Sequence, residues 1–197
     1  MRTTSPTSDV TRGRNLLMAT VVFGHAIKHV YNAGLHSLIL PAIKIDFRLS
    51  GTQFGLLVSA RQVTSWGTTI GAGYLGDRFT SRAPLILGLS LGLLGFSFFL
   101  AGHVTSYWVM LAVMLLIGLG PALFHPPAIG ELSRRFPDRR GFAISLHGTG
   151  GIAGEILGPL VAAGLLVVLS WRDVMQWSLI PALMAGLLMW GMMRPLP

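Results

Sequence analysis

The chain has 197 residues, of which 52% are hydrophobic and only 11% are charged. Soluble domains carry about 25% charged residues, so this composition excludes an ordinary soluble domain and indicates a protein embedded in a lipid bilayer. The net charge of +8 would favour nucleic-acid binding in a soluble protein. Here the basic residues lie mostly in short connectors, and we expect no nucleic-acid partner. The absence of cysteine excludes disulfides and thiolate metal sites.

The first 15 residues are polar and carry Arg2, Arg12 and Arg14. We predict that residues 1–15 form a flexible cytoplasmic tail. A signal peptide is rejected because the apolar stretch that follows is too long, contains Lys28 and lacks a clear small-x-small cleavage site.

Six apolar stretches follow, each long enough to cross a membrane. A hydrocarbon core about 30 Å thick needs roughly 20 helical residues, and backbone polar groups in lipid must be paired. The predicted fold class is therefore an all-α membrane protein whose six transmembrane helices form one bundle over residues 16–194. The predicted spans are residues 16–40, 52–74, 83–102, 106–131, 142–169 and 173–193.

The basic residues fall unevenly on the two sides of this bundle. The excess on one side predicts that both termini are cytoplasmic and that the chain is a multi-pass protein of the cell (inner) membrane. Two further cations, Lys28 and Arg61, fall inside spans. The richer side holds Arg2, Arg12, Arg14, Arg78, Arg82, Arg134, Arg135, Arg139, Arg140 and Arg194; the poorer side holds Lys44, Arg48 and Arg172.

The first span carries a polar face. Helical spacing places its members on one side of the helix, which we expect to line the bundle interior or a wet cavity. Transporters bind substrates near the membrane midplane, so these are candidate cavity residues. They are His25, Lys28, His29, Asn32 and His36.

Ionisable residues of two other spans lie at a similar depth. These are Arg61, next to Gln62 in the second span, and Glu155 in the fifth. A charge at mid-membrane costs about 2.5–3.5 kcal/mol on insertion scales, so it needs a partner or water. We expect Glu155 to pair with Lys28 or Arg61, which leaves one cation for an anionic substrate such as a phosphonate or carboxylate. A buried structural ion network is the alternative.

The connector at residues 73–82 reads Gly-Tyr-Leu-Gly-Asp-Arg-Phe-Thr-Ser-Arg. It resembles the loop between the second and third helices of major facilitator transporters, Gly-x-Leu-Ala-Asp-Arg/Lys-x-Gly-Arg/Lys-Arg/Lys, although Thr80 and Ser81 depart from that pattern. The resemblance implies a gating loop that latches against a second half of the transporter. An ordinary positive-inside loop is the alternative. The matching residues are Gly73, Leu75, Asp77, Arg78 and Arg82.

The fourth span contains His125 followed by Pro126 and Pro127. Prolines remove backbone donors, so we predict a local break in this helix and place His125 among the cavity residues. The side chains of His125, His147 and Glu155 are candidates for proton coupling, because the environment can move the pKa of either residue type toward neutrality. Hydrogen-bonded packing is the alternative for both histidines.

The fifth span has small residues at every fourth position: Gly150, Gly154, Gly158 and Ala162. Such a strip lets helix backbones approach closely, and Pro159 can bend the span. The segment resembles the antiporter motif Gly-x-x-x-Gly-Pro-x-x-Gly-Gly, with alanine in place of the final glycines. Close helix packing and a role in coupling are compatible interpretations.

Two further segments narrow the resemblance. The Phe-His-Pro-Pro-Ala block at residues 124–128 and the Ser-Leu-His-Gly-Thr-Gly-Gly run at 145–151 are similar to the fosmidomycin-resistance-type branch of major facilitator transporters. The resemblance implies the N-terminal half of a twelve-helix fold, built from two inverted three-helix repeats. It also implies proton-coupled efflux of a small drug or metabolite, without a cofactor, together with a C-terminal six-helix half or a homodimer partner.

Two other functions stay open. A metal-cation carrier could use the histidines His25, His29, His36, His125 and His147, although no tight ligand motif is present and no metal site is predicted. A non-transporting membrane fragment or scaffold is the other, because alternating access needs one half to move against another. An enzyme is not expected, since no nucleophile motif or phosphate-binding loop occurs.

Overall fold

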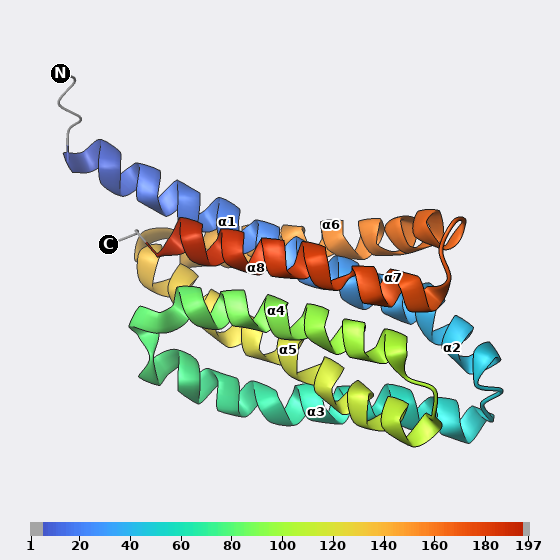
Figure 1. Ribbon diagram of the computed structural model, residues 1–197. Coiled ribbons are helices and arrows are strands. Elements are labelled where there is room, and N and C mark those ends of the chain that lie inside the picture. Colours follow the sequence, from blue (N-terminus) through green and yellow to red (C-terminus); the bar gives the residue numbers. More distant parts are fainter. Residues whose placement is uncertain (1–5, 195–197) are drawn as a thin grey trace.

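A computed structural model describes the backbone of residues 6–194 and the side chains of residues 13–35 and 37–194. In the described part of the chain six long helical rods run side by side, and the start of α1 and the end of α8 lie at the same end of the bundle (Figure 1). The first rod joins α1 (Pro6–Gly34), the π-helical η1 (Leu35–Ile39) and α2 (Leu40–Asp46). The others are α3 (Gly51–Arg78), α4 (Ala83–His103), α5 (Tyr107–Arg135), α6 (Arg140–Leu166), and α7 (Trp171–Trp177) followed by α8 (Leu179–Met193).

The outside of this bundle is apolar. Large side chains such as Ile45, Trp66, Trp108 and Val167 are each more than 70% exposed, which fits a lipid environment and not water. Four segments of the described chain are both long and apolar enough to cross a membrane, and α1 and α3 match them in length but carry the buried cations Lys28 and Arg61. The four segments are Thr80–His103, Tyr107–Arg135, Pro137–Leu166 and Trp171–Met193.

The helix connectors differ between the two ends of the bundle. At one end Ser50, Ser106 and Ser170 each accept a backbone N–H of the helix that follows, and so cap α3, α5 and α7. At the other end α3 and α5 stop at Phe79 and Phe136, and each phenylalanine leads into one 3₁₀ turn, η2 (Thr80–Arg82) or η3 (Pro137–Arg139). The start of α1, the end of α8 and both 3₁₀ turns therefore share one side (Figure 1).

The contacts between the helical rods show an internal symmetry between the first three rods and the last three. The first rod packs mainly on α6, and α5 packs mainly on α3; α4 contacts both α5 and the α7–α8 rod. Exchanging rods one to three with rods four to six preserves these pairs, and the contact of α4 with α5 then corresponds to a lighter contact of α1 with α8. This is the arrangement expected of two inverted three-helix repeats.

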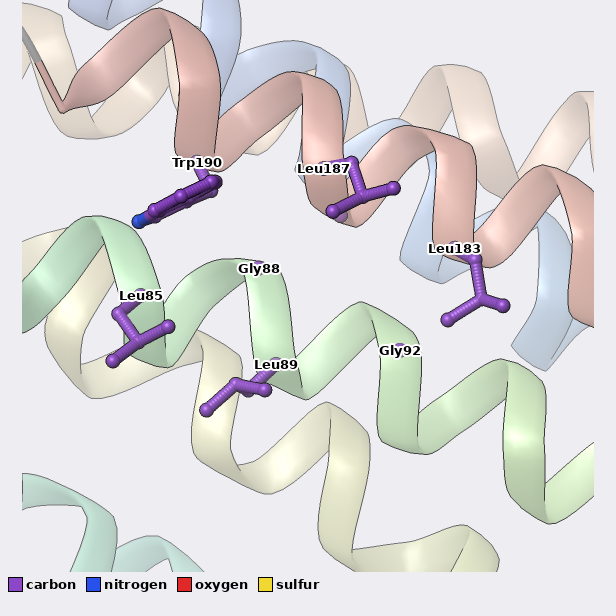
Figure 2. A pocket seen from close by; sticks show the side chains of 8 residues that line it. Leu85, Gly88, Leu89, Gly92, Leu183, Leu187 and Trp190 are labelled. Atoms are coloured by element: carbon purple, nitrogen blue, oxygen red, sulfur yellow. The ribbon is translucent and has the colours of Figure 1, made fainter.

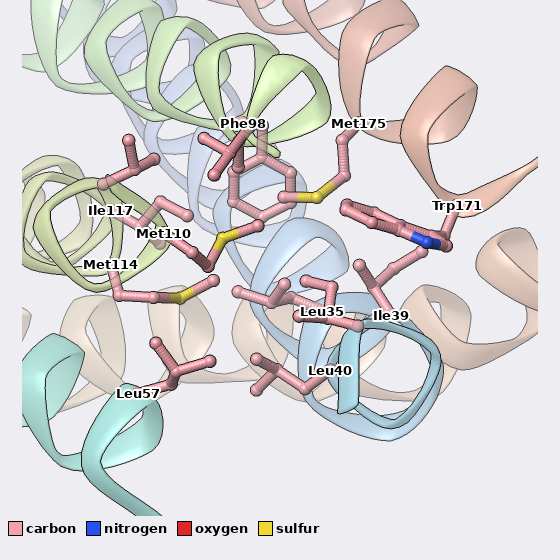
Figure 3. Packing of buried hydrophobic residues seen from close by; sticks show 14 of the residues in the cluster. Leu35, Ile39, Leu40, Leu57, Phe98, Met110, Met114, Ile117, Trp171 and Met175 are labelled. Atoms are coloured by element: carbon pink, nitrogen blue, oxygen red, sulfur yellow. The ribbon is translucent and has the colours of Figure 1, made fainter. Parts of the chain in front are cut away.

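Two apolar cores lie along the first rod. One gathers around Leu35, Met110 and Met175, drawn from η1, α5 and α7 (Figure 3). The second gathers around Leu17, Phe124 and Met189. Between Val21 and Leu35, α1 adds only partly buried side chains to the edges of these cores, Val22, Ile27 and Tyr31, and this part carries the predicted polar face.

The segment predicted to be a flexible cytoplasmic tail is helical from Pro6 onward, and residues 1–5 lie outside the described part. The predicted break in the fourth span is wrong, because α5 is a continuous helix through Pro121, Pro126 and Pro127. Proline fixes φ near −65°, which is helical, so its missing donors need not interrupt a helix supported by neighbouring helices.

Candidate functional site

Three rods bring polar side chains together between the two apolar cores. We call this group the histidine cluster: it contains His25, Lys28 and His29 from α1, His125 from α5, and His147 and Glu155 from α6. All six residues were singled out from the sequence. The side chain of His36, predicted to share this face, lies outside the described residues.

The imidazoles pack tightly against one another. The rings of His25 and His147 stack with centroids 3.8 Å apart and planes 13° apart, and His125 meets His25 edge-on at 4.8 Å. Gly151 makes room for them, because an added Cβ would lie 2.7 Å from Cε1 of His25. No role at this site was predicted for Gly151, because spacing along the chain does not reveal its neighbours across the helix interface.

A chain of hydrogen bonds runs from α6 through α1 and back to α6. His25 Nδ1 lies 2.8 Å from the carbonyl oxygen of His147, and His25 Nε2 lies 3.0 Å from His29 Nε2. His29 Nδ1 is in turn 3.1 Å from Oε1 of Glu155. The sequence predicted Lys28 or Arg61 as the partner of Glu155, and the structure places the carboxylate against His29.

Lys28 is the most deeply buried cation of the cluster, with 2% of its surface exposed. Its Nζ hydrogen-bonds to Nε2 of His125. A charged ammonium has no acceptor lone pair, so His125 Nε2 accepts this bond whenever Lys28 is charged. Glu155 and Arg61 are both close enough for their charges to act on Lys28.

Arg61 forms a second polar group beside the cluster. Its guanidinium donates to Oδ1 of Asn32 at 3.4 Å and to Oε1 of Gln62 at 3.0 Å. Arg61 is 7% exposed, whereas Gln62 is exposed. The backbone of Gly118 on α5 packs directly on the Arg61 carbonyl, which fixes α3 against α5 at this depth.

The histidine geometry suits hydrogen bonding better than metal coordination. His25, His125 and His147 each bring a ring nitrogen to within 4.8 Å of the others. Zinc binds imidazole nitrogen at about 2.0–2.1 Å, along a lone pair that lies in the ring plane. Because the rings of His25 and His147 are nearly parallel and stacked, one ion cannot lie in both ring planes.

The glycine strip of α6 faces α1. A Cβ on Gly158 would lie 2.6 Å from the Val30 carbonyl, and Cβ atoms on Gly150 and Gly154 would meet the carbonyls of Val22 and Ala26. Glycine is therefore required for this approach. It brings the helix backbones close enough for the short side chains of the cluster to meet.

A similar glycine contact joins α4 to α8 and leaves a groove on the outside of the bundle. A Cβ on Gly88 would lie 2.8 Å from the carbonyl of Gly186. The adjoining apolar pocket of about 240 Å³ is flanked by Leu85 and Leu89 on one helix and Leu187 and Trp190 on the other (Figure 2). None of its lining residues belongs to the histidine cluster.

The predicted gating loop lies at the end of α3, apart from the cluster. Asp77 and Arg78 are exposed, and the guanidinium groups of Arg78 and Arg82 each lie 5.7 Å from the centroid of the Phe79 ring. Within the described part of the chain Asp77 forms no ion pair. Gly76 packs on Pro127, with a Cβ contact of 3.4 Å, and so holds this end of α3 on α5.

Comparison with known proteins identifies the family. The chain is 30% identical over 164 residues to the fosmidomycin resistance protein of Escherichia coli, covering 81% of this chain and 39% of that protein. It is 29% identical over 170 residues to the MFS-type transporter YfnC of Bacillus subtilis, covering 83% and 40%. The oxalate:formate antiporter of Oxalobacter formigenes is 34% identical over 129 residues, covering 65% and 28%. The chain thus spans well under half the length of these relatives.

The fold agrees with that assignment. A bacterial homologue of the human lysosomal transporter Spinster, solved in an inward-facing and unoccupied conformation, superimposes with a TM-score of 0.73 at 18% identity. The match covers 99% of this chain and 45% of that protein. The family model of the Major Facilitator Superfamily matches residues 26–197 of this chain. With six long helical rods and this match over most of its length, the chain belongs to the Major Facilitator Superfamily.

Proposed function

We propose that this chain forms the substrate- and proton-handling half of a secondary transporter that exports a small acidic molecule in exchange for protons. The observation that carries the proposal is the histidine cluster, a group of ionisable side chains between two apolar cores of a membrane bundle. Burying such groups in lipid is costly, and in transporters they mark substrate and proton paths. Transport, and not an enzymatic reaction, is the chemistry that this arrangement supports.

The cations favour an acidic substrate. Lys28 on α1 and Arg61 on α3 are both buried, so two cations stand against the single carboxylate of the cluster, Glu155, which lies 3.1 Å from His29. Two relatives are named for fosmidomycin and for oxalate and formate, which are all acids. A phosphonate or carboxylate group is therefore the best candidate ligand for this pair of cations.

Protons are the proposed coupling ion. His125, His147 and Glu155 are the candidates, and Glu155 is the most accessible of them, with 61% of its side chain exposed. Histidine and carboxylate groups exchange protons readily when a path to water exists. Replacing Glu155 with glutamine should abolish uphill efflux yet spare substrate exchange.

The proposal requires a partner and an orientation. Alternating access needs a second six-helix unit, either a C-terminal half or a second copy of this chain. The exposed Asp77 and Arg78 are free to contact it, as a gating loop would. By the positive-inside rule we propose that the arginine-rich end of the bundle, where α1 begins and α8 ends, lies in the cytoplasm and the bundle in the inner membrane.

Transport by the complete protein tests the substrate site. We expect Lys28→Ala and Arg61→Ala, made singly, each to weaken the affinity for fosmidomycin or oxalate by about tenfold to hundredfold, the usual effect of losing a hydrogen bond to a charged group. Uptake into inverted vesicles measures the affinity. Lys44→Ala is the matched control. Lys44 lies in the last turn of α2, outside the histidine cluster, with its ammonium over the ring of Phe54.

Unchanged affinity in both cluster variants would remove the substrate proposal. Isothermal titration with zinc separates it from the metal-cation carrier. Zinc binding by the wild type that is lost in His125→Ala would support that carrier in place of the acidic substrate.

A further inference from the structure

We infer that His25, His29 and Glu155 together hold one transferable proton beyond those of two neutral imidazoles. The inference deepens the proposed function, on which it rests for the use that transport makes of this proton. The presence of the proton follows from the direction of three hydrogen bonds, and it can be measured without any transport.

The first bond fixes the tautomer of His25. The carbonyl oxygen of His147 can only accept, so the Nδ1 of His25, 2.8 Å away, must carry a proton and donate it. If His25 is neutral, its Nε2 has no proton. That nitrogen must then accept the second bond, which makes Nε2 of His29 the donor over 3.0 Å.

The third bond, between His29 Nδ1 and Glu155 Oε1, lacks a proton if both imidazoles are neutral and the carboxylate is ionised. A neutral His29 that donates from Nε2 has a bare Nδ1, and a carboxylate oxygen also carries no proton. These two acceptors lie 3.1 Å apart, where two lone pairs would repel. Three hydrogen bonds need three protons, whereas two neutral imidazoles and one carboxylate supply two.

The extra proton satisfies the chain wherever it rests. It can sit on His29 as an imidazolium beside a carboxylate, on Glu155 as a carboxylic acid, or on His25 with the middle bond reversed. In each case the three residues have zero net charge. Lys28 on α1, Arg61 on α3, and His125 and His147 on α5 and α6 face the same region. The charge of Lys28 opposes a positive charge on His29, so the bond geometry, and not the surrounding charge, is what requires the extra proton.

Release of this proton has a defined structural result. The proton passes from His29 Nδ1 or Glu155 Oε1 to water, and two neutral imidazoles and a carboxylate remain. The bond between His29 and Glu155 is then lost, because the other two bonds still have their protons. Glu155, with its side chain 61% exposed, is free to turn away from α1.

The chain is well suited to a direct measurement. It contains two glutamates, Glu131 and Glu155, and six histidines. Glutamates labelled with ¹³C and histidines labelled with ¹⁵N, in protein held in lipid nanodiscs, report the protonation of each carboxyl and each ring nitrogen. Glu131 serves as an internal reference, because Arg134 donates to its carboxylate at 2.7 Å.

At neutral pH we expect one excess proton, seen either as an imidazolium or as a protonated Glu155. In Glu155→Gln the amide NH₂ can donate to His29 Nδ1, so all three bonds form without the extra proton. This variant should therefore show His29 neutral with its proton on Nε2, and should release one proton fewer than the wild type when the pH is raised. The control Glu131→Gln should retain the excess proton.

Two results would overturn the inference: an ionised Glu155 beside two neutral imidazoles at neutral pH, or equal proton release by the wild type and Glu155→Gln. The outcome is separable from that of the proposed function. A measured excess proton without proton-coupled transport would leave this inference standing and remove the coupling proposal. Coupled transport without the excess proton would do the reverse.

Discussion

At the scale of single residues, glycine decides where α1 and α6 can meet. Each glycine of the α6 strip lies under a carbonyl of α1, and Gly151 lies beside the rings of His25 and His29. A methyl group on the strip would collide with backbone, which cannot move as a flexible side chain can, and one at Gly151 would collide with the histidine rings. The close approach that creates the histidine cluster therefore depends on the absence of side chains as much as on the polar groups themselves.

Gly154→Ala tests this dependence. The added methyl group would collide with the Ala26 carbonyl, so we expect a loss of stability of about 1–3 kcal/mol, the usual cost of overpacking. Thermal unfolding in detergent measures it. Gly148→Ala, on the same helix but with open space around it, should be neutral or stabilising, because alanine is the better helix former by about 1 kcal/mol. Equal destabilisation by the two changes would contradict the packing argument.

At the scale of elements, two connectors repeat one design. After α3 and after α5 a phenylalanine with φ near −120° stops the helix, and a 3₁₀ turn leads into the next rod. Arginines cover both rings: Arg78 and Arg82 lie over Phe79, and Arg14 lies over Phe136 at 4.6 Å. Arg14 also donates to Asp138 at 2.6 Å, so the start of α1 is tied to the second connector.

The tie between Arg14 and Asp138 should depend on pH. The hydrogen bond from Arg14 lowers the pKa of the Asp138 carboxyl below its ordinary value. A carboxyl with a lowered folded pKa stabilises the fold above its unfolded pKa of about 4, and the contribution is lost as the pH falls through the folded pKa. Asp138→Asn should thus lower the unfolding temperature slightly near neutral pH and have no effect in strong acid.

The exposed Asp77 offers the matched control for that experiment. Asp77→Asn removes a carboxylate at the neighbouring connector, where the described residues provide no ion pair. Its unfolding temperature should follow that of the wild type near neutral pH. A difference between Asp138→Asn and the wild type that persisted in strong acid would show that the aspartate acts through something other than its charge.

At the scale of the whole molecule, the start of α1, the end of α8 and the arginine-bearing turns η2 and η3 lie at one end of the bundle (Figure 1). The chain lacks cysteine, so single introduced cysteines can be labelled without background. With membrane-impermeant maleimide we expect Ser81→Cys, in η2, to react only from the cytoplasmic side. Thr105→Cys, in the connector at the opposite end, should react only from the outside. The reverse labelling would invert the proposed orientation.

The sequence predicted those features that depend on local pattern. Span length and composition gave the six rods, and helical spacing placed His25, Lys28 and His29 on one face. Features that depend on contact across helices were not predictable in the same way. The partner of Glu155 depends on which α1 side chain the glycine strip brings within reach. The proline break was wrong because removing donors limits hydrogen bonding without forcing the backbone out of its helical path.

The tight seam between α1 and α6 has a consequence for the timing of proton transfer. Carbonyls of one helix rest on the glycines of the other, so the two helices must travel as a single rigid body through any transport cycle. The backbones of His25, His29 and Glu155 all belong to that body, so the spacing of these backbones would stay constant during the proposed transport cycle. Water must then reach the three residues from alternate sides of the membrane, and this alternation would decide when they load and unload.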